Sequence, residues 1–213
     1  MLITLTGPSL TGKSTLAREL EKVGYEELVS FTTRPMRANE VDGKTYWFLT
    51  HEKIQGYQQR NELMELIELG EHSYGLSKEE FDRVMGLGKV GVLVVAPNGL
   101  KQVREYCENF DIPVYSAFVN NDKHVLVKRF LERFKEDHLA NVDNYVKRFM
   151  QFDEEYIEWT KPALDGEMKY DVILPKFEES NTADAIATII EQSTQKFNAH
   201  SQAKQDKKSK YRP

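Results

Sequence analysis

Residues 7–15 read Gly-Pro-Ser-Leu-Thr-Gly-Lys-Ser-Thr and fill the pattern G-x-x-x-x-G-K-[ST]. They follow directly on the short apolar run Leu2–Thr6, and a helical pattern begins at Ser14. A buried strand that delivers the chain to a tight loop, followed by a helix with free N–H groups in its first turn, is the setting in which such a stretch binds an anion. We therefore interpret residues 7–15 as a phosphate-binding loop.

Each part of this loop has a predicted task. Gly7 and Gly12 let the backbone wrap closely around phosphate oxygens, Lys13 can reach the β- and γ-phosphates, and the Ser14 hydroxyl is placed to ligate Mg²⁺. The predicted metal ligand is Ser14, and the predicted cofactor is Mg²⁺ with ATP as co-substrate. The predicted ATP-binding residues are Gly7, Pro8, Ser9, Thr11, Gly12, Lys13, Ser14 and Thr15.

Composition sets the broad class of the protein. The chain has 213 residues, of which 40% are hydrophobic and 30% charged, with a formal net charge of −5. This is ordinary usage for a folded soluble protein, long enough for one sizeable core with an inserted lobe. The negative charge gives no general attraction to polyanions, so we expect no specific nucleic-acid binding. No apolar run approaches the roughly 18 residues of a membrane span, and no basic region precedes the first strand. We therefore expect a cytoplasmic monomer or dimer without membrane contact.

Apolar runs alternate with helical periodicity along the chain. This alternation predicts an α/β fold with a parallel sheet flanked by helices, of the type found in P-loop NTPases, because continuous apolar strands are covered on both faces. The predicted strands are Leu2–Thr6, Leu28–Phe31, Val90–Ala96, Val114–Val119 and Tyr170–Leu174. The predicted helices are Lys13–Val23, Gly99–Asn109, Lys123–Glu136, Asn144–Thr160 and Thr182–Phe197.

Residues 32–88 have a different texture, rich in Arg, Glu, Tyr and Gly, with short alternating segments such as 45–49 and 63–67. They predict a small antiparallel lobe inserted into the parallel core. Within it, residues 77–80 form a capping-box sequence that predicts the start of a helix. We expect one domain over 1–197, with its core at 1–31 and 89–197 and a helical lid at about 129–148, followed by a basic disordered tail over 198–213.

The lobe carries a second set of motifs. Residues 30–37 read Ser-Phe-Thr-Thr-Arg-Pro-Met-Arg, residues 40–48 read Glu-Val-Asp-Gly-Lys-Thr-Tyr-Trp-Phe, and residues 70–79 read Gly-Glu-His-Ser-Tyr-Gly-Leu-Ser-Lys-Glu. Together these stretches closely resemble the nucleotide-acceptor signature of the guanylate kinase family. The resemblance runs from the phosphate loop to about residue 175 and implies a nucleoside monophosphate kinase.

The clamp for an acceptor phosphate can be read from charge. A monophosphate carries close to two negative charges, which the guanidiniums of Arg34 and Arg37 and the hydroxyls of Tyr46 and Tyr74 would neutralise and hold. The resemblance implies the same role for these positions. It also implies that Glu65 accepts hydrogen bonds from the N1–H and 2-amino edge of guanine. The predicted acceptor-binding set is Ser30, Arg34, Arg37, Tyr46, Glu65, Tyr74 and Gly75.

Phosphoryl transfer also needs cations around the transferring group. Arg129 and Arg133 lie four residues apart on a predicted helix and so share a face, and Arg148 follows on the next helix. These arginines resemble the lid arginines of the family. The predicted catalytic residues are Lys13, Arg129, Arg133 and Arg148.

Three positions depart from the family pattern. Val94-Val95-Ala96 stands where the family carries Asp-x-Asp, Leu76 replaces a hydroxyl residue that touches guanine, and Pro175 replaces an asparagine near adenine. Each buried polar group left without a partner costs a base-reading site roughly 1–3 kcal/mol of discrimination. A relaxed base preference is therefore an open alternative to strict GMP and dGMP phosphorylation.

Two further hypotheses stay open. The first is a kinase of another small phosphate ester such as ribose 1,5-bisphosphate, since related phosphokinases also lack the Asp-x-Asp pattern. The second is a non-catalytic interaction module that holds a phosphorylated or acidic peptide. The retained Glu65 and Tyr46 argue against the first, and the intact Lys13-Ser14 pair argues against the second.

Overall fold

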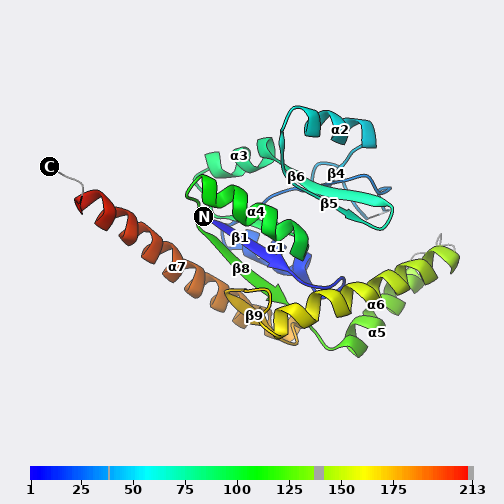
Figure 1. The fold of residues 1–213 in the computed structure, drawn as a ribbon. Helices are drawn as coiled ribbons and strands as arrows, with labels where there is room; N and C mark the ends of the chain where they lie inside the picture. The colour runs from blue at the N-terminus through cyan, green and yellow to red at the C-terminus, as the bar shows by residue number, and fades with distance from the viewer. Residues whose placement is uncertain (38, 137–141, 211–213) are drawn as a thin grey trace.

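The computed structural model describes residues 1–37, 39–136 and 142–210. Its centre is a five-stranded sheet in the order β2-β7-β1-β8-β9, with every neighbouring pair parallel. The predicted parallel sheet flanked by helices is confirmed (Figure 1). Its strands are β1 (Leu2–Thr6), β2 (Glu26–Glu27), β7 (Gly91–Val94), β8 (Val114–Val119) and β9 (Val172–Leu174).

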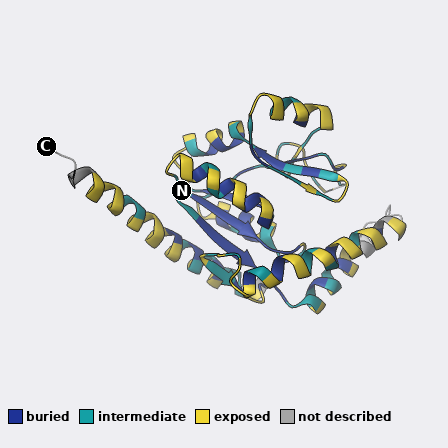
Figure 2. Ribbon diagram, in the orientation of Figure 1, coloured by how far each residue is buried: buried dark blue, intermediate teal, exposed yellow. Residues whose placement is uncertain are grey.

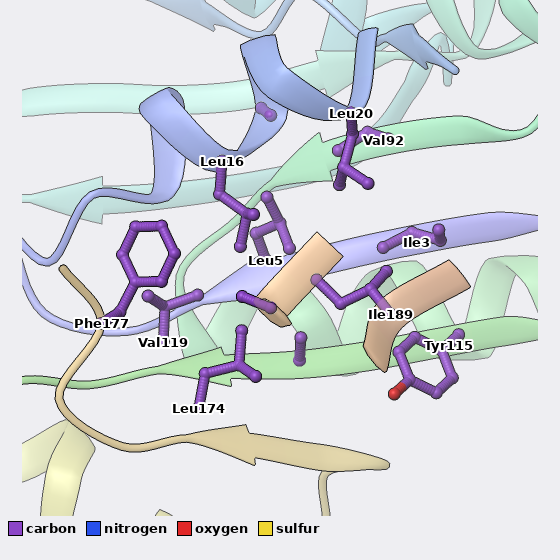
Figure 3. Close-up of a cluster of buried hydrophobic side chains, with 13 residues drawn as sticks. Ile3, Leu5, Leu16, Leu20, Val92, Tyr115, Val119, Leu174, Phe177 and Ile189 are labelled. Carbon is purple, nitrogen blue, oxygen red and sulfur yellow. The ribbon is translucent and has the colours of Figure 1, made fainter. Parts of the chain in front are cut away.

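Helices cover both faces of this sheet. On one face, α1 (Lys13–Lys22) and α7 (Thr182–Lys210) pack against Ile3, Leu5 and their neighbours (Figure 3). On the other face, α4 (Pro97–Asn109) and α3 (Lys78–Gly86) pack against Leu2 and Leu93. Because strand side chains alternate between faces, β1 contributes side chains to the apolar packing on both faces and is buried along its whole length.

The inserted lobe holds a second sheet of four strands in the order β4-β3-β6-β5. The prediction of an antiparallel lobe is wrong in one respect, because β3 and β4 pair in parallel and the sheet is therefore mixed. These strands are β3 (Phe31–Thr32), β4 (Trp47–Phe48), β5 (Leu63–Leu69) and β6 (His72–Ser77). A helix that the sequence did not predict, α2 (His51–Gln59), links β4 to β5.

The predicted strand Leu28–Phe31 is wrong. The chain forms β2 before it and β3 at its end, and residues 28–30 cross from the large sheet to the small one. The Glu80 carboxylate accepts a hydrogen bond from the Val29 backbone N–H at 2.8 Å, which fixes this crossing. Glu80 is the last residue of the capping-box sequence. Ser77, the first residue, caps the helix as predicted, because its hydroxyl accepts a hydrogen bond from the Glu80 N–H at 3.2 Å.

Two helices, α5 (Lys123–Glu136) and α6 (Val142–Leu164), form the region predicted as a lid (Figure 1). Their facing sides share an aromatic cluster built on Phe130, Tyr145 and Phe152. The part of the predicted lid at 137–141 lies outside the described residues. A short 3-10 turn, η1 (Glu179–Asn181), precedes α7.

The predicted disordered tail is wrong for residues 198–210, because α7 continues to Lys210 and runs away from the body of the molecule (Figures 1 and 2). Two of its basic side chains lie beside one carboxylate: Lys204 Nζ is 2.6 Å and His200 Nε2 is 3.1 Å from Asp111. Gln202 also donates to Asp206 one turn later, at 3.0 Å. These contacts, in a segment rich in good helix formers, favour helix over coil. Residues 211–213 lie outside the described residues.

Candidate active site

The loop between β1 and α1 is shaped by its two glycines. Gly7 has φ +145° and Gly12 has φ +99°, backbone regions that glycine enters at little cost. A Cβ at Gly7 would overlap the Val119 carbonyl, and one at Gly12 would lie 2.7 Å from the Phe177 ring. The loop therefore has room only for glycine at these two positions. The first turn of α1 carries no acidic residue, so its free N–H groups face an anion unopposed.

Lys13 is held inside this loop. Its Nζ donates to the carbonyl oxygens of Gly7 at 2.6 Å and Pro8 at 2.7 Å. Burial lowers the pKa of Lys13 to about 8, and the negative charge of Glu155 partly opposes this change. A phosphate group in the loop would supply the missing negative charge.

The two helices of the lid region contact the loop. Glu155 of α6 accepts a hydrogen bond from the Ser9 hydroxyl at 2.9 Å, and Arg129 of α5 donates to the Leu10 carbonyl at 3.0 Å. Within the loop, the buried Thr11 hydroxyl donates to the Pro8 carbonyl at 2.9 Å. The donor side of the site is therefore built from β1, α1, α5 and α6 together.

Ser14 and Thr15 are exposed at the start of α1. Among the residues that the structure describes, no protein group hydrogen-bonds the Ser14 hydroxyl, and no cluster of His, Cys, Asp or Glu forms a metal cage. This arrangement fits Mg²⁺ held by one hydroxyl together with phosphate oxygens and waters, as this ion prefers.

The guanidinium of Arg34 is buried in the lobe. It forms two parallel hydrogen bonds with the Glu40 carboxylate, one of them at 2.6 Å, and lies 5.1 Å from the centre of the Tyr46 ring. The same carboxylate accepts from the Arg37 backbone N–H at 2.9 Å. Glu40 therefore holds both arginines of the predicted clamp, a task that the sequence reasoning missed although Glu40 lies within the quoted motif.

Arg37 is more exposed than Arg34 and lies among other cations. Burial and the positive charges of Arg34, Arg133 and Arg148 together lower the pKa of Arg37 to about 10, and Glu40 opposes them in part. Arg133 is exposed on α5 and Arg148 half-buried on α6. The charges of two of the three lid arginines therefore act on Arg37 of the predicted clamp, and the third, Arg129, contacts the phosphate loop.

The two tyrosines of the predicted clamp pack edge to face, with ring centres 6.1 Å apart. Burial raises the pKa of Tyr46, so its hydroxyl keeps its proton and can donate a hydrogen bond. Gly75 lies next to Tyr74 on β6, where a Cβ would overlap the Glu65 carbonyl and lie 2.5 Å from the Phe31 ring. Ser30 lies half-buried where the chain crosses to the lobe, and its carbonyl accepts from the Trp47 N–H at 2.9 Å.

Glu65 is a buried carboxylate on β5, only 4% exposed. Among the described residues no side chain or backbone N–H donates to it, and burial raises its pKa to about 8. Of the three departures from the family pattern, Leu76 is fully buried in the core, Pro175 is exposed after β9, and Ala96 precedes the first residue of α4 without a side-chain cap.

A second carboxylate that the sequence reasoning missed is Glu155. It is the acidic side chain whose charge acts on Lys13, although it lies 142 positions further along the chain and no local pattern marks it. Among the described residues, no helix combines the length and apolar composition needed to cross a bilayer.

A family model described as guanylate kinase matches residues 1–197. The guanylate kinase of Onion yellows phytoplasma is 30% identical over 193 residues, which cover 89% of this chain and 84% of that protein. The guanylate kinases of Chlamydia pneumoniae and Lactobacillus johnsonii are 39% and 33% identical over 48% and 62% of this chain. These two matches span 52% and 65% of those proteins, so the chain aligns with about half to two thirds of their length.

A solved structure shares the fold. The crystal structure of guanylate kinase from Anaplasma phagocytophilum superposes with a TM-score of 0.63 at 21% identity, over 91% of this chain and 85% of that chain. At this identity the likeness bears on the fold, and it agrees with the parallel sheet and separate small sheet described above.

Proposed function

The chain belongs to the guanylate kinase family, and from this premise we propose that it transfers the γ-phosphoryl group of ATP to GMP or dGMP, giving ADP and GDP or dGDP. One observation carries the proposal. The same pair of helices, α5 and α6, contacts the phosphate loop through Arg129 and Glu155 and carries Arg133 and Arg148, whose positive charges act on Arg37. Arginines of these helices would therefore serve both the donor loop and the acceptor clamp, between which a transferring phosphoryl group would lie.

On the donor side, ATP binds with its β- and γ-phosphates in the loop 7–14. Lys13 then exchanges its contacts with the Gly7 and Pro8 carbonyls for phosphate oxygens. The Ser14 hydroxyl would hold Mg²⁺, which when bound would neutralise part of the triphosphate charge. The loop residues that bind ATP are Gly7, Pro8, Ser9, Thr11, Gly12, Lys13, Ser14 and Thr15.

On the acceptor side, Arg34, Arg37, Tyr46 and Tyr74 hold the monophosphate. Glu65 accepts hydrogen bonds from guanine, while Ser30 and Gly75 border the base. Glu40 keeps Arg34 oriented toward this pocket in the absence of substrate, since both nitrogens of one guanidinium edge pair with its carboxylate.

The chemical step needs positioning more than acid–base chemistry. An oxygen of the acceptor phosphate attacks the γ-phosphorus, and the bond from that phosphorus to the β–γ bridging oxygen breaks with its electron pair remaining on ADP. The second pKa of a monophosphate is about 6, so the attacking oxygen is already ionised at neutral pH and no general base is required. Lys13, Arg129, Arg133 and Arg148 stabilise the charge that spreads over the transferring oxygens.

The domain organisation that we propose has one domain over residues 1–197. The core comprises 1–31 and 89–197, the acceptor lobe 32–88, and the lid about 129–148. Closure of the lobe and lid over both substrates would exclude water that otherwise hydrolyses ATP.

A coupled ADP-release assay with ATP and Mg²⁺ tests the proposal against GMP, dGMP, AMP, dAMP, CMP, UMP, dTMP and ribose 1,5-bisphosphate. We expect turnover with GMP and dGMP. Comparable turnover with several bases would mean that Leu76 and Ala96 have relaxed base selection, whereas turnover with the sugar phosphate alone would replace the proposed acceptor. Silence across the panel would contradict catalysis and favour an interaction module.

A further inference from the structure

The strand that carries Glu65 has a free edge, and α4 lies along it. In the small sheet β5 is the terminal strand and pairs only with β6. On its other side, the side-chain amide of Gln102 forms two hydrogen bonds with the backbone of Leu66. The Leu66 N–H donates to Gln102 Oε1 at 3.1 Å, and Gln102 Nε2 donates to the Leu66 carbonyl at 2.9 Å. Gln102 thus completes the edge as a neighbouring strand would.

One turn earlier on the same helix, Gly99 faces the Glu65 side chain. A Cβ built at Gly99 would overlap Oε1 of the Glu65 carboxylate. Gly99 does not have a left-handed backbone conformation, so a turn is not the reason for glycine here. The missing side chain instead leaves room for the Glu65 carboxylate. The carboxylate therefore occupies volume beside the first turn of α4 that any other residue at position 99 would fill.

The contacts of Gly99 and Gln102 hold two neighbouring residues of β5 against the same helix, α4. α4 is anchored in the core by Leu100, Val103 and Cys107, each fully buried. Since residues 99 and 102 are three apart, they lie on one face of the helix, and that face meets β5 at Glu65 and Leu66. The position of the carboxylate is accordingly fixed by the core helix as well as by the lobe.

We propose that Gly99 and Gln102 are positioning residues that set the guanine selectivity of the site by fixing the Glu65 carboxylate against α4. The inference rests on the proposed function, since it assigns Glu65 to the base. Two of the three departures from the family pattern strengthen the inference, because Leu76 and Ala96 supply no side-chain hydrogen bond to the base. Selection of guanine then depends strongly on where one carboxylate lies, and a displacement of about 1 Å is enough to lose a well-aligned pair of hydrogen bonds.

The test compares GMP with IMP, which lacks only the 2-amino group, as phosphoryl acceptors for the wild-type chain and three variants. Gln102→Met removes both hydrogen bonds at an exposed position with little change in side-chain length. Gly99→Ala forces the carboxylate to move while favouring the helix. Lys101→Met is the matched control, an exposed neighbour on α4 that forms no hydrogen bond or ion pair with the described residues of β5.

We expect Gln102→Met and Gly99→Ala each to raise the KM for GMP about tenfold, the effect of misaligning a charged hydrogen-bond pair. The ratio of kcat/KM for GMP to that for IMP should fall by a similar factor. The KM for ATP of both variants and all parameters of Lys101→Met should stay at their wild-type values. A Gly99→Ala variant that fails to fold leaves Gln102→Met to decide the question.

An unchanged GMP-to-IMP ratio in Gln102→Met would overturn the positioning role. Equal losses for GMP, IMP and ATP would also overturn it, because they would indicate a general structural defect. A wild-type chain that does not phosphorylate GMP would instead overturn the proposed function, and the role of Glu65 with it, so the two failures are distinguishable.

Discussion

Replacing Glu65 by glutamine is expected to stabilise the protein by an amount that grows with pH. The carboxyl is buried without a donor among the described residues, and burial raises its pKa from an ordinary value of 4.5 to about 8. The folded chain therefore keeps a proton on this group over a pH range in which the unfolded chain has released it. The glutamine amide is of similar shape and carries no charge at any pH.

The sign and size of the effect follow from proton linkage. Because the folded-state pKa lies above the unfolded value, the wild-type stability is greatest below pH 4.5, falls as the pH rises toward 8 and is constant above it. The slope in this window is about 1.4 kcal/mol per pH unit. Between pH 5.5 and 7.5 the Glu65→Gln variant should therefore gain about 3 kcal/mol over the wild type. The dipole of α4, whose positive end lies beside the carboxylate, opposes this by only about 0.3–1 kcal/mol.

Urea unfolding at half-unit pH intervals measures this difference directly, with Glu71→Gln as a control at an exposed carboxylate between β5 and β6. Substrate binding should report the same group. Guanine needs the ionised carboxylate, so the KM for GMP of the wild type should rise about tenfold for each pH unit below 8, and this trend should be absent in Glu65→Gln. A stability difference that is constant from pH 5.5 to 7.5 would refute the reasoning, since the carboxyl would then titrate in the folded chain as it does in the unfolded one.

Three other substitutions test the remaining parts of the site. Lys13→Ala should lower kcat by a factor of about 10²–10³ or more without loss of fold, because a preorganised cation at the phosphates is removed; near-normal kcat in a folded variant would exclude Lys13 from the reaction. Arg37→Ala should raise the KM for GMP about 10- to 100-fold, the range for a lost charged hydrogen bond, and leave the KM for ATP in place; an unchanged acceptor KM would remove Arg37 from the clamp. Glu40→Ala should lower the free energy of unfolding by about 3–5 kcal/mol, because Arg34 loses its buried partner. GMP should then raise the melting temperature of Glu40→Ala more than that of the wild type, and an equal rise in both would contradict the pairing.

The parts of the fold that could be predicted from the sequence are those whose cause is local. The strands Leu2–Thr6 and Val114–Val119 have the predicted bounds, and the helix predicted from Lys123 begins there, since a continuous apolar run and a 3.6-residue period each identify their element without reference to the rest of the chain. The phosphate loop belongs to the same class, because strand, glycines and helix follow one another directly.

The errors arose where partners distant in the sequence decide the structure. Residues 28–30 are apolar enough for a strand, but Glu80 binds the Val29 N–H and the chain crosses between sheets there. The basic segment after Phe197 reads as disordered by composition, yet Asp111 accepts contacts from two of its side chains. The parallel pairing of β3 with β4 likewise joins two strands that are separated in the sequence, and no local pattern indicates the direction in which they pair.

The candidate site shows the same division. The loop motif predicts a role for Lys13, and charge with the family resemblance predicts roles for Arg34 and Arg37, whereas the carboxylates near them require the folded chain. Glu40 pairs with Arg34 across a loop, and Glu155 reaches the phosphate loop from a helix far along the chain. Neither the Gly99 contact nor the Gln102 contact has any signal in the sequence, because both depend on how α4 meets a strand of the other sheet.

The placement of Lys13 affects what ATP does to the whole molecule. An ammonium group whose pKa has fallen to about 8 has already lost most of its hydration when the chain folds. In the nucleotide-free protein this poorly hydrated cation therefore lowers the free energy of unfolding, and the hydrogen bonds to two backbone carbonyls offset only part of that loss. A bound triphosphate would contact an ammonium group that is already desolvated. Less of the electrostatic attraction is then spent on removing water, and more of it contributes to affinity. By mass action, binding of ATP under the proposed function would also make the occupied protein harder to unfold.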